Sequence, residues 1–347
     1  MGLKVGVTRD ERFAEHKTGH SHPEHPRRIL EIYRMIDREF GDELLCFRPR
    51  PAALEDLERV HTPAHMQKIL KTAEQRTTSL APDTPASARS YMAAWLAAGA
   101  CLQGIDMLFE KQCRAFFALV RPPGHHALPD RSAGFCVFNN IAVAARYAMV
   151  RHGIKKIFII DWDVHHGNGL NDIFYEDDRV YYYSTHDIML YPYSGEPGHT
   201  GSGRGLGYTM NIPISREFND DDMVYIYTQT LIPAIRGFCP DMIMVAAGFD
   251  AHNEDPIGKC RFTENLYARI TRMIIAAMCE EKKSPLLFLA LEGGYEPLAL
   301  ARCVRGVLRE LLGNENSEAE NFFEPSAEAS KLVGRIKKIH TPYGVLT

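Results

Sequence analysis

KIFIIDWDVHHGNG, residues 156–169, joins a short apolar run to a dense group of acidic residues, histidines and glycines. Four more segments have the same form, an unbroken apolar run that leads directly into polar or glycine-rich sequence. Apolar runs of this length without polar alternation are typical of strands that are buried on both faces of a parallel sheet. The four segments are residues 115–120 (AFFALV), 180–183 (VYYY), 242–247 (MIMVAA) and 286–290 (LLFLA).

Amphipathic stretches separate these predicted strands, and they are long enough to form crossover helices. Apolar residues recur at helical spacing in Ile141–Arg151, Met223–Phe238 and Leu266–Met278. No internal repeat or low-complexity linker divides the chain. We therefore predict an α/β fold, in which residues 1–347 form one domain around a mostly parallel, doubly wound sheet with helices on both faces. Thr72–Ala88 and Gly313–Pro325 are expected to be surface loops, the second followed by a short C-terminal helix.

The overall composition narrows the class of protein. The chain has 347 residues, a formal net charge of −4 and 45% hydrophobic residues, which excludes a disordered or fibrous chain. The balanced charge argues against nucleic-acid binding through a basic surface. No apolar run approaches the roughly 20 residues that span a bilayer, and we find no secretory signal. The eight cysteines show no CxxC spacing, which indicates free thiols and a cytoplasmic protein without membrane attachment.

The predicted strand ends carry potential metal ligands. Asp161, Asp163 and His165 are spaced two residues apart after the run 156–160, so in an extended chain their side chains point the same way. Asp163 and His165 lie furthest out, and Asp250 ends another predicted strand. Carboxylate and imidazole groups bind zinc or a similar divalent ion. Because parallel strands end on one side of the sheet, we expect Asp163, His165 and Asp250 to form a catalytic metal site.

Acid–base residues occupy two further strand ends. His125 and His126 follow RPPG, and imidazole titrates near neutrality, so this pair suits proton transfer beside a metal. Asp161 is placed to orient one of the two rings. Tyr295, in LEGGY, can donate a hydrogen bond to a developing oxyanion. Together these residues predict acid–base chemistry on a metal-bound water, with a hydrogen-bond donor for a developing oxyanion.

Five motifs carry a family resemblance: RPPGHH, GFCVFNN, DWDVHHGNG, AAGFDAHNEDPIG and LEGGY. They closely resemble the zinc-dependent histone deacetylase and acetylpolyamine amidohydrolase family, and HKTGHSHPEHPRRI resembles its class II branch. The resemblance spans about residues 16–312 and leaves 313–347 as a C-terminal extension. It implies the arginase/deacetylase fold and an enzyme that removes acetyl or longer acyl groups, with N-acetyl-lysine as the expected substrate and an acylated lysine or acylated small amine as its partner.

The resemblance also implies roles for individual residues. One zinc ion is bound by Asp163, His165 and Asp250. His126 acts as general base and then general acid, His125 pairs with Asp161, and Tyr295 polarises the scissile carbonyl. The substrate tunnel is formed by Gly134, Phe135, Tyr191 and, at a gatekeeper position, Ile257. A structural potassium ion is held by Asp161, Asp163, His165, Ser184 and Thr185, and a second cation by carbonyl groups near Phe174, Asp177, Val180 and Tyr208.

Two departures from the family pattern bear on the branch of the family and on the substrate. Asn168 stands at a position that is Asp in class I members. Class II members share this Asn, so it indicates the class II branch. Ile257 stands where polyamine-specific members can carry an acidic residue, and Thr72–Ala88 is short for the insertion that narrows the amidohydrolase tunnel. An acetylpolyamine or other small-amide amidohydrolase remains the main alternative. An arginase-type binuclear manganese hydrolase and a catalytically silent acyl-lysine-binding module are less favoured.

Overall fold

The computed structural model describes residues 4–280, 285–313 and 324–345. Its centre is an eight-stranded sheet in which every neighbouring pair of strands is parallel. The strand order is β2-β1-β5-β10-β9-β6-β7-β8. The strands are β1 (Val5–Thr8), β2 (Leu44–Phe47), β5 (Ala115–Ala118), β6 (Ile157–Asp161), β7 (Val180–His186), β8 (Thr209–Pro213), β9 (Met242–Ala247) and β10 (Leu286–Leu291).

Five of these strands coincide with the apolar runs of the sequence, and all five lie in the buried middle of the sheet. Every residue of β5, β6, β7 and β9 is buried. This explains why they lack polar alternation, since both faces of a central parallel strand are covered by helices. The edge strand β2 is partly exposed, and its pattern is correspondingly weak.

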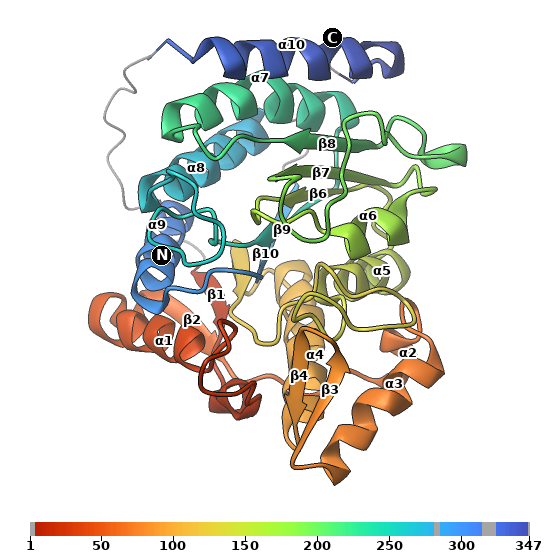
Figure 1. Ribbon diagram of the computed structural model, residues 1–347, viewed down its shortest axis with the longest axis vertical. Coiled ribbons are helices and arrows are strands. Elements are labelled where there is room, and N and C mark those ends of the chain that lie inside the picture. The colour runs from red at the N-terminus through yellow and green to blue at the C-terminus, as the bar shows by residue number, and fades with distance from the viewer. Residues whose placement is uncertain (1–3, 281–284, 314–323, 346–347) are drawn as a thin grey trace.

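Helices cover both faces of the sheet (Figure 1). One layer holds α4 (Ser90–Phe109), α5 (Asn140–His152) and α6 (Asn168–Phe174), with the short α2 (Leu54–Leu57) and α3 (Pro63–Leu70) beside it. The other layer is a row of packed neighbours, α1 (Arg27–Glu39), α9 (Pro297–Leu312), α8 (Glu264–Glu280) and α7 (Asp220–Phe238), and α10 (Ala327–His340) lies outside α7. The predicted doubly wound α/β architecture is confirmed.

Helix α4 is an exception to the expectation that no apolar stretch approaches the length that spans a bilayer. By length and composition α4 could cross a membrane, because its most apolar window has a mean hydropathy of 1.4. However, 72% of that window is buried inside the protein, where α4 packs against α5 and β5. Small residues and scattered polar residues interrupt the apolar pattern of α4, so the segment is not obvious in the sequence. A mostly buried core helix meets the same criteria of length and composition as a membrane-spanning helix.

The segment Thr72–Ala88 was wrongly predicted to be a plain loop. It continues a 3-10 turn (Lys71–Glu74) into an antiparallel hairpin of β3 (Thr77–Ala81) and β4 (Thr84–Ser87). The hairpin is short and polar, so the sequence pattern gave little sign of it. Of the second predicted loop, Gly313–Pro325, residues 314–323 lie outside the described residues, and the predicted C-terminal helix is α10.

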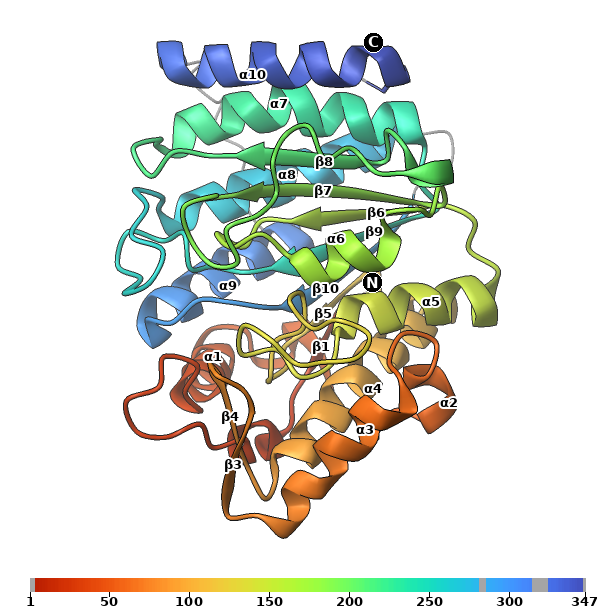
Figure 2. The same ribbon diagram turned by 45° about the vertical axis from the view of Figure 1, so that its right-hand side comes forward.

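The carboxyl ends of the strands bring the polar motifs together. The arrowheads of β6, β7 and β8 point toward one edge of the molecule, where the loops that follow them gather (Figure 2). Within the sheet, Asp161 at the end of β6 pairs in register with Ser184 of β7 and Ala246 of β9. DWDVHHGNG and GFDAHNEDPIG therefore leave the sheet side by side.

Candidate active site

Asp163, His165 and Asp250 form a compact buried cluster. One potential ligand atom from each lies within 4.8 Å of the others. The Nδ1 atom of His165 is 3.0 Å from Asp163 Oδ1 and 2.9 Å from Asp250 Oδ2. Gly293 donates its backbone N–H to the other oxygen of Asp163 at 2.9 Å, and a Cβ at Gly293 would lie 2.3 Å from Asp250 Oδ2. The structure thus brings together the three residues predicted to bind a metal.

The electrostatics of this cluster favour a cation. Asp163 and Asp250 are both 0% exposed, so their negative charges face each other away from water. Burial, and then the charge of Asp163, raise the pKa of Asp250. Burial acts in the same direction on Asp163, yet the nearby imidazoles of His125 and His165 hold its pKa below the usual range. Two buried carboxylates that share one site are stabilised by positive charge between them.

The histidine pair lies beside this cluster. The rings of His125 and His126 are 4.0 Å apart, centroid to centroid. His125 Nδ1 lies 3.1 Å from Asp161 Oδ2, and its Nε2 lies 3.8 Å from Asp163 Oδ2. The predicted pairing of Asp161 with one histidine is therefore present, and that histidine is His125.

His126 has a different partner and a different charge state. Its Nδ1 donates to Asn168 Oδ1 at 2.8 Å, which leaves Nε2 free to accept a proton. Burial, followed by the charge of the neighbouring His125 ring, lowers the pKa of His126 well below its ordinary value. His126 is consequently neutral near pH 7, which is the state that a general base requires.

Tyr295 lies in the turn after β10, two residues after Gly293, whose N–H binds Asp163. The residue is 9% exposed, and its ring makes an edge contact with Phe135 at 5.6 Å between centroids. Asp255 accepts a hydrogen bond from the Tyr295 backbone N–H at 2.6 Å, and the Arg28 guanidinium lies 4.9 Å from the ring centroid. Burial raises the pKa of the Tyr295 phenol well above its ordinary value, so it stays a hydrogen-bond donor.

The residues predicted to line a tunnel surround these groups. Gly134 has φ +55°, and a Cβ there would lie 2.3 Å from the His126 ring and 2.9 Å from Tyr191. Tyr191 makes an edge contact with His126 at 5.0 Å between centroids. Ile257 lies further out: it is half-buried, and its N–H donates to Asp255, the carboxylate that also holds the Tyr295 backbone.

The residues predicted to hold a monovalent cation are all buried, but their hydroxyl groups have protein partners. Ser184 Oγ is 2.8 Å from His186 Nδ1, and Thr185 Oγ1 is 2.7 Å from the hydroxyl of Tyr227. For the second cation, the carbonyl groups of Phe174, Asp177 and Tyr208 accept backbone N–H bonds from Asp177, Val180 and Tyr182, respectively. A carbonyl oxygen has a second lone pair, so these bonds do not prevent coordination.

Sequence reasoning missed two residues that shape the site. The Tyr182 hydroxyl donates to Asp161 Oδ2 at 2.9 Å, on the carboxylate that holds His125. Asp255 binds the backbone of Tyr295. The alternation of β7 could have pointed to Tyr182, because it lies two residues before Ser184 and on the same face. Nothing in the local pattern of Asp255 indicates a partner 40 residues away.

Comparison with known proteins identifies the family of the chain. Residues 22–311 match the family model of the histone deacetylase domain. The chain is 33% identical to a probable deacetylase of Archaeoglobus fulgidus, over 98% of this chain and 99% of the relative. It is 35% identical to histone deacetylase 14, chloroplastic, of Arabidopsis thaliana, over 92% of this chain and 81% of the relative.

The fold is equally similar to that of a solved structure. The crystal structure of the HDA15 HD domain superposes with a TM-score of 0.91 at 33% identity, covering 98% of this chain and 95% of that one. The matched span agrees with the resemblance noted in the sequence, and the fold agrees with the predicted sheet. The chain belongs to the histone deacetylase family and is a hydrolase of the deacetylase type.

Proposed function

We propose that this deacetylase removes acetyl or longer acyl groups from lysine side chains in a single catalytic domain that contains one zinc ion. One observation carries the proposal: Asp163, His165 and Asp250 converge within 4.8 Å beside the histidine pair. The alkyl stem of an acylated lysine is slim and apolar, which suits an approach between Phe135 and Tyr191.

The donor set fits zinc. Two carboxylates and one imidazole would neutralise a divalent ion and leave positions for water and substrate, as in catalytic rather than structural zinc sites. Within the described residues, the buried like charges of Asp163 and Asp250 are otherwise offset only by the imidazoles of His165 and His125. When bound, zinc supplies a Lewis acid that polarises the substrate carbonyl and lowers the pKa of water.

The side chains of the site then divide the work of hydrolysis. His126 takes a proton from the attacking water at Nε2, because its Nδ1 proton is held by Asn168. Tyr295 donates its phenolic O–H to the oxygen of the scissile carbonyl. His126 next returns the proton to the nitrogen of the leaving amine. His125, held by Asp161, contributes positive charge beside the reacting atoms.

The remaining expectations are part of the same proposal. A potassium ion beside Asp161, Asp163, His165, Ser184 and Thr185 would offset the buried negative charge behind the zinc site. The seven cysteines with described side chains are unpaired, which supports a reducing compartment such as the cytoplasm. The chloroplastic name of one relative belongs to that protein. We propose no binding to nucleic acid or membrane.

Substrate choice and metal content test the proposal together. Turnover is measured on an acetyl-lysine peptide, a longer acyl-lysine peptide and an acetylated polyamine, with and without a chelator. We expect the lysine peptides to be preferred, activity to be lost with the chelator and restored by zinc, and about one zinc per chain. Preference for the polyamine would favour the alternative, two manganese ions would favour an arginase-type enzyme, and peptide binding without turnover would favour a silent module.

A further inference from the structure

Glu292 is a buried carboxylate that the mechanism above does not use. It lies directly after the last residue of β10 and is 1% exposed. Its Oε2 atom accepts the backbone N–H groups of Gly124 at 2.6 Å and of His125 at 3.1 Å. These two amides belong to the turn that carries both histidines of the active site. A single carboxylate oxygen thus ties the end of β10 to that turn.

Within the described residues, Glu292 is the acceptor of both of these amides. Pro122 and Pro123 have no N–H group, so Gly124 and His125 supply the first two amides after Arg121. The turn has no room for a side chain at position 124 that could accept these N–H groups in place of Glu292. A Cβ there would lie 2.6 Å from the backbone nitrogen of Asn140. The carbonyl groups are held elsewhere: Gly124 O accepts from Ala127, and His125 O from Leu170.

Glu292 is itself held rigidly. The guanidinium of Arg28, which is 0% exposed, donates to the backbone carbonyls of Glu292 and Gly294. The backbone of Glu292 is therefore fixed on one side of the sheet end, and its side chain reaches the histidine turn on the other. Because both ends are buried, a small displacement of the carboxylate would be transmitted to the turn.

The second oxygen of Glu292 lies in the same buried region. Oε1 has no hydrogen-bond partner in the part of the chain that the structure describes. One Glu292 oxygen, Cys136 Sγ and one His125 ring nitrogen lie within 4.8 Å of one another. Burial is the main cause that raises the pKa of Glu292 to about 7. A glutamate buried at this cost beside the reacting groups calls for a role.

We propose that Glu292 is a positioning residue for hydrolysis, and this inference rests on the proposed function. Its carboxylate oxygen fixes the backbone of the Gly124–His125 turn, so that the rings of His125 and His126 face the cluster of Asp163, His165 and Asp250. The essential property is the location of the acceptor oxygen, and the negative charge is secondary. The proposal therefore predicts that moving the acceptor oxygen is more harmful than removing the charge, and two substitutions test this.

The decisive variants are Glu292→Gln and Glu292→Asp. Glutamine keeps a carbonyl oxygen at the same reach without charge, whereas aspartate keeps the charge and withdraws the oxygen by one methylene. We expect E292Q to retain kcat within about threefold, and E292D to lose about 10- to 100-fold in kcat with little change in KM, since a misplaced group can cost about a hundredfold. Zinc content should be unchanged in both variants.

Two controls make the outcome clear. Glu310 is a buried glutamate on α9 that pairs with Arg272, so E310Q shows the effect of losing a buried glutamate charge elsewhere. The ¹⁵N resonances of the His125 and His126 rings report their surroundings without any substrate. We expect these resonances to shift in E292D and to stay near the wild-type positions in E292Q and E310Q.

Each result bears on one proposal. E292D with wild-type kcat and unchanged histidine resonances would overturn the positioning role. Loss of activity in E292Q equal to that in E292D would also overturn it, because charge would then be what matters. Wild-type protein that binds zinc but hydrolyses no acylated amine would instead contradict the proposed function, and the histidine resonances would still decide the role of Glu292.

Discussion

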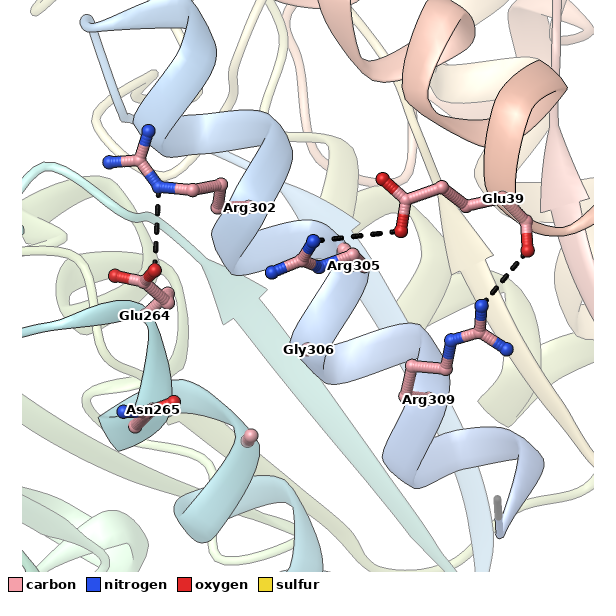
Figure 3. A pocket seen from close by; sticks show the side chains of 8 residues that line it. Glu39, Glu264, Asn265, Arg302, Arg305, Gly306 and Arg309 are labelled. Atoms are coloured by element: carbon pink, nitrogen blue, oxygen red, sulfur yellow. Dashed lines mark hydrogen bonds and ion pairs between the residues drawn. The ribbon is translucent and has the colours of Figure 1, made fainter. Parts of the chain in front are cut away.

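Charged side chains are concentrated in two regions of the molecule. In one region opposite charges are paired at the surface, and in the other like charges are buried together. The first is a surface groove of about 430 Å³ between α1, α8 and α9, lined by arginines and glutamates (Figure 3). There Arg302 lies 3.4 Å from Glu264, Arg305 lies 3.6 Å from Glu39, and Arg309 donates to the backbone carbonyl of Glu39. Each guanidinium finds an acceptor, and the side chains remain partly exposed.

The second region is the cluster of Asp163, His165 and Asp250, where like charges are buried together. No arginine or lysine pairs with these carboxylates among the interactions of the described residues. Paired and hydrated charge, as in the groove, stabilises a protein only slightly. Unbalanced buried charge is costly to keep, so its presence marks the site where a cation and a substrate are expected.

Removing one carboxylate of the buried cluster should have the largest effect. We expect Asp250→Asn to reduce zinc from about one per chain to near zero and to lower kcat/KM by more than about a hundredfold, since even residues that merely support metal ligands are worth ~10–100-fold. Metal analysis and turnover on an acetyl-lysine peptide provide the measurement. A variant that keeps its zinc and activity would show that Asp250 is not a ligand.

Removing the phenol of Tyr295 should have the next largest effect. We expect Tyr295→Phe to lower kcat by about 10²- to 10³-fold, the range for losing one donor to an oxyanion, while zinc content stays unchanged. A loss of turnover without a loss of zinc would distinguish the role of Tyr295 from that of the metal ligands. Full activity of the purified variant would refute the proposed role of Tyr295.

A buried group far from both regions gives a test through pH. His340, on α10, is 0% exposed, and neither ring nitrogen has a hydrogen-bond partner within the described chain. Burial lowers the pKa of His340 to about 4. The unfolded chain binds the proton below about pH 6.5 and the folded chain only near pH 4, so stability falls as pH drops through this window, by up to about 3 kcal/mol.

Urea unfolding of wild type and His340→Leu at several pH values measures this contribution. We expect the difference in unfolding free energy between the two proteins to change in favour of the variant between about pH 6.5 and pH 4, and to be constant above pH 7.5. A pH-independent difference would mean that His340 does not titrate as its burial implies.

The smallest effect is expected in the groove. Glu39→Gln removes the partner of Arg305 but keeps the backbone carbonyl that Arg309 uses. Because the pair is long and its side chains are 40% and 29% exposed, we expect a loss of less than about 1 kcal/mol and no change in zinc content or turnover. An effect on activity would show that the groove is coupled to the active site.

The sequence was most informative where a local pattern reflects burial. The runs that became β5, β6, β7, β9 and β10 were recognisable because central parallel strands are apolar throughout. The hairpin of β3 and β4 was missed because its residues are polar and its pairing is set by the turn. The apolar helix α4 was missed for the converse reason, since small and polar residues interrupt a segment that packing buries.

The sequence by itself determined which residue types follow each strand, and hence that carboxylates, imidazoles and a phenol would gather at one edge of the sheet, because parallel strands end on one side. Tertiary structure alone decided which atoms meet. It placed the Tyr182 hydroxyl on Asp161, bound Asp255 to the backbone of Tyr295, and joined Glu292 to a turn 168 residues away. Such pairings depend on the order and register of strands distant in the chain, and local residue patterns do not encode these.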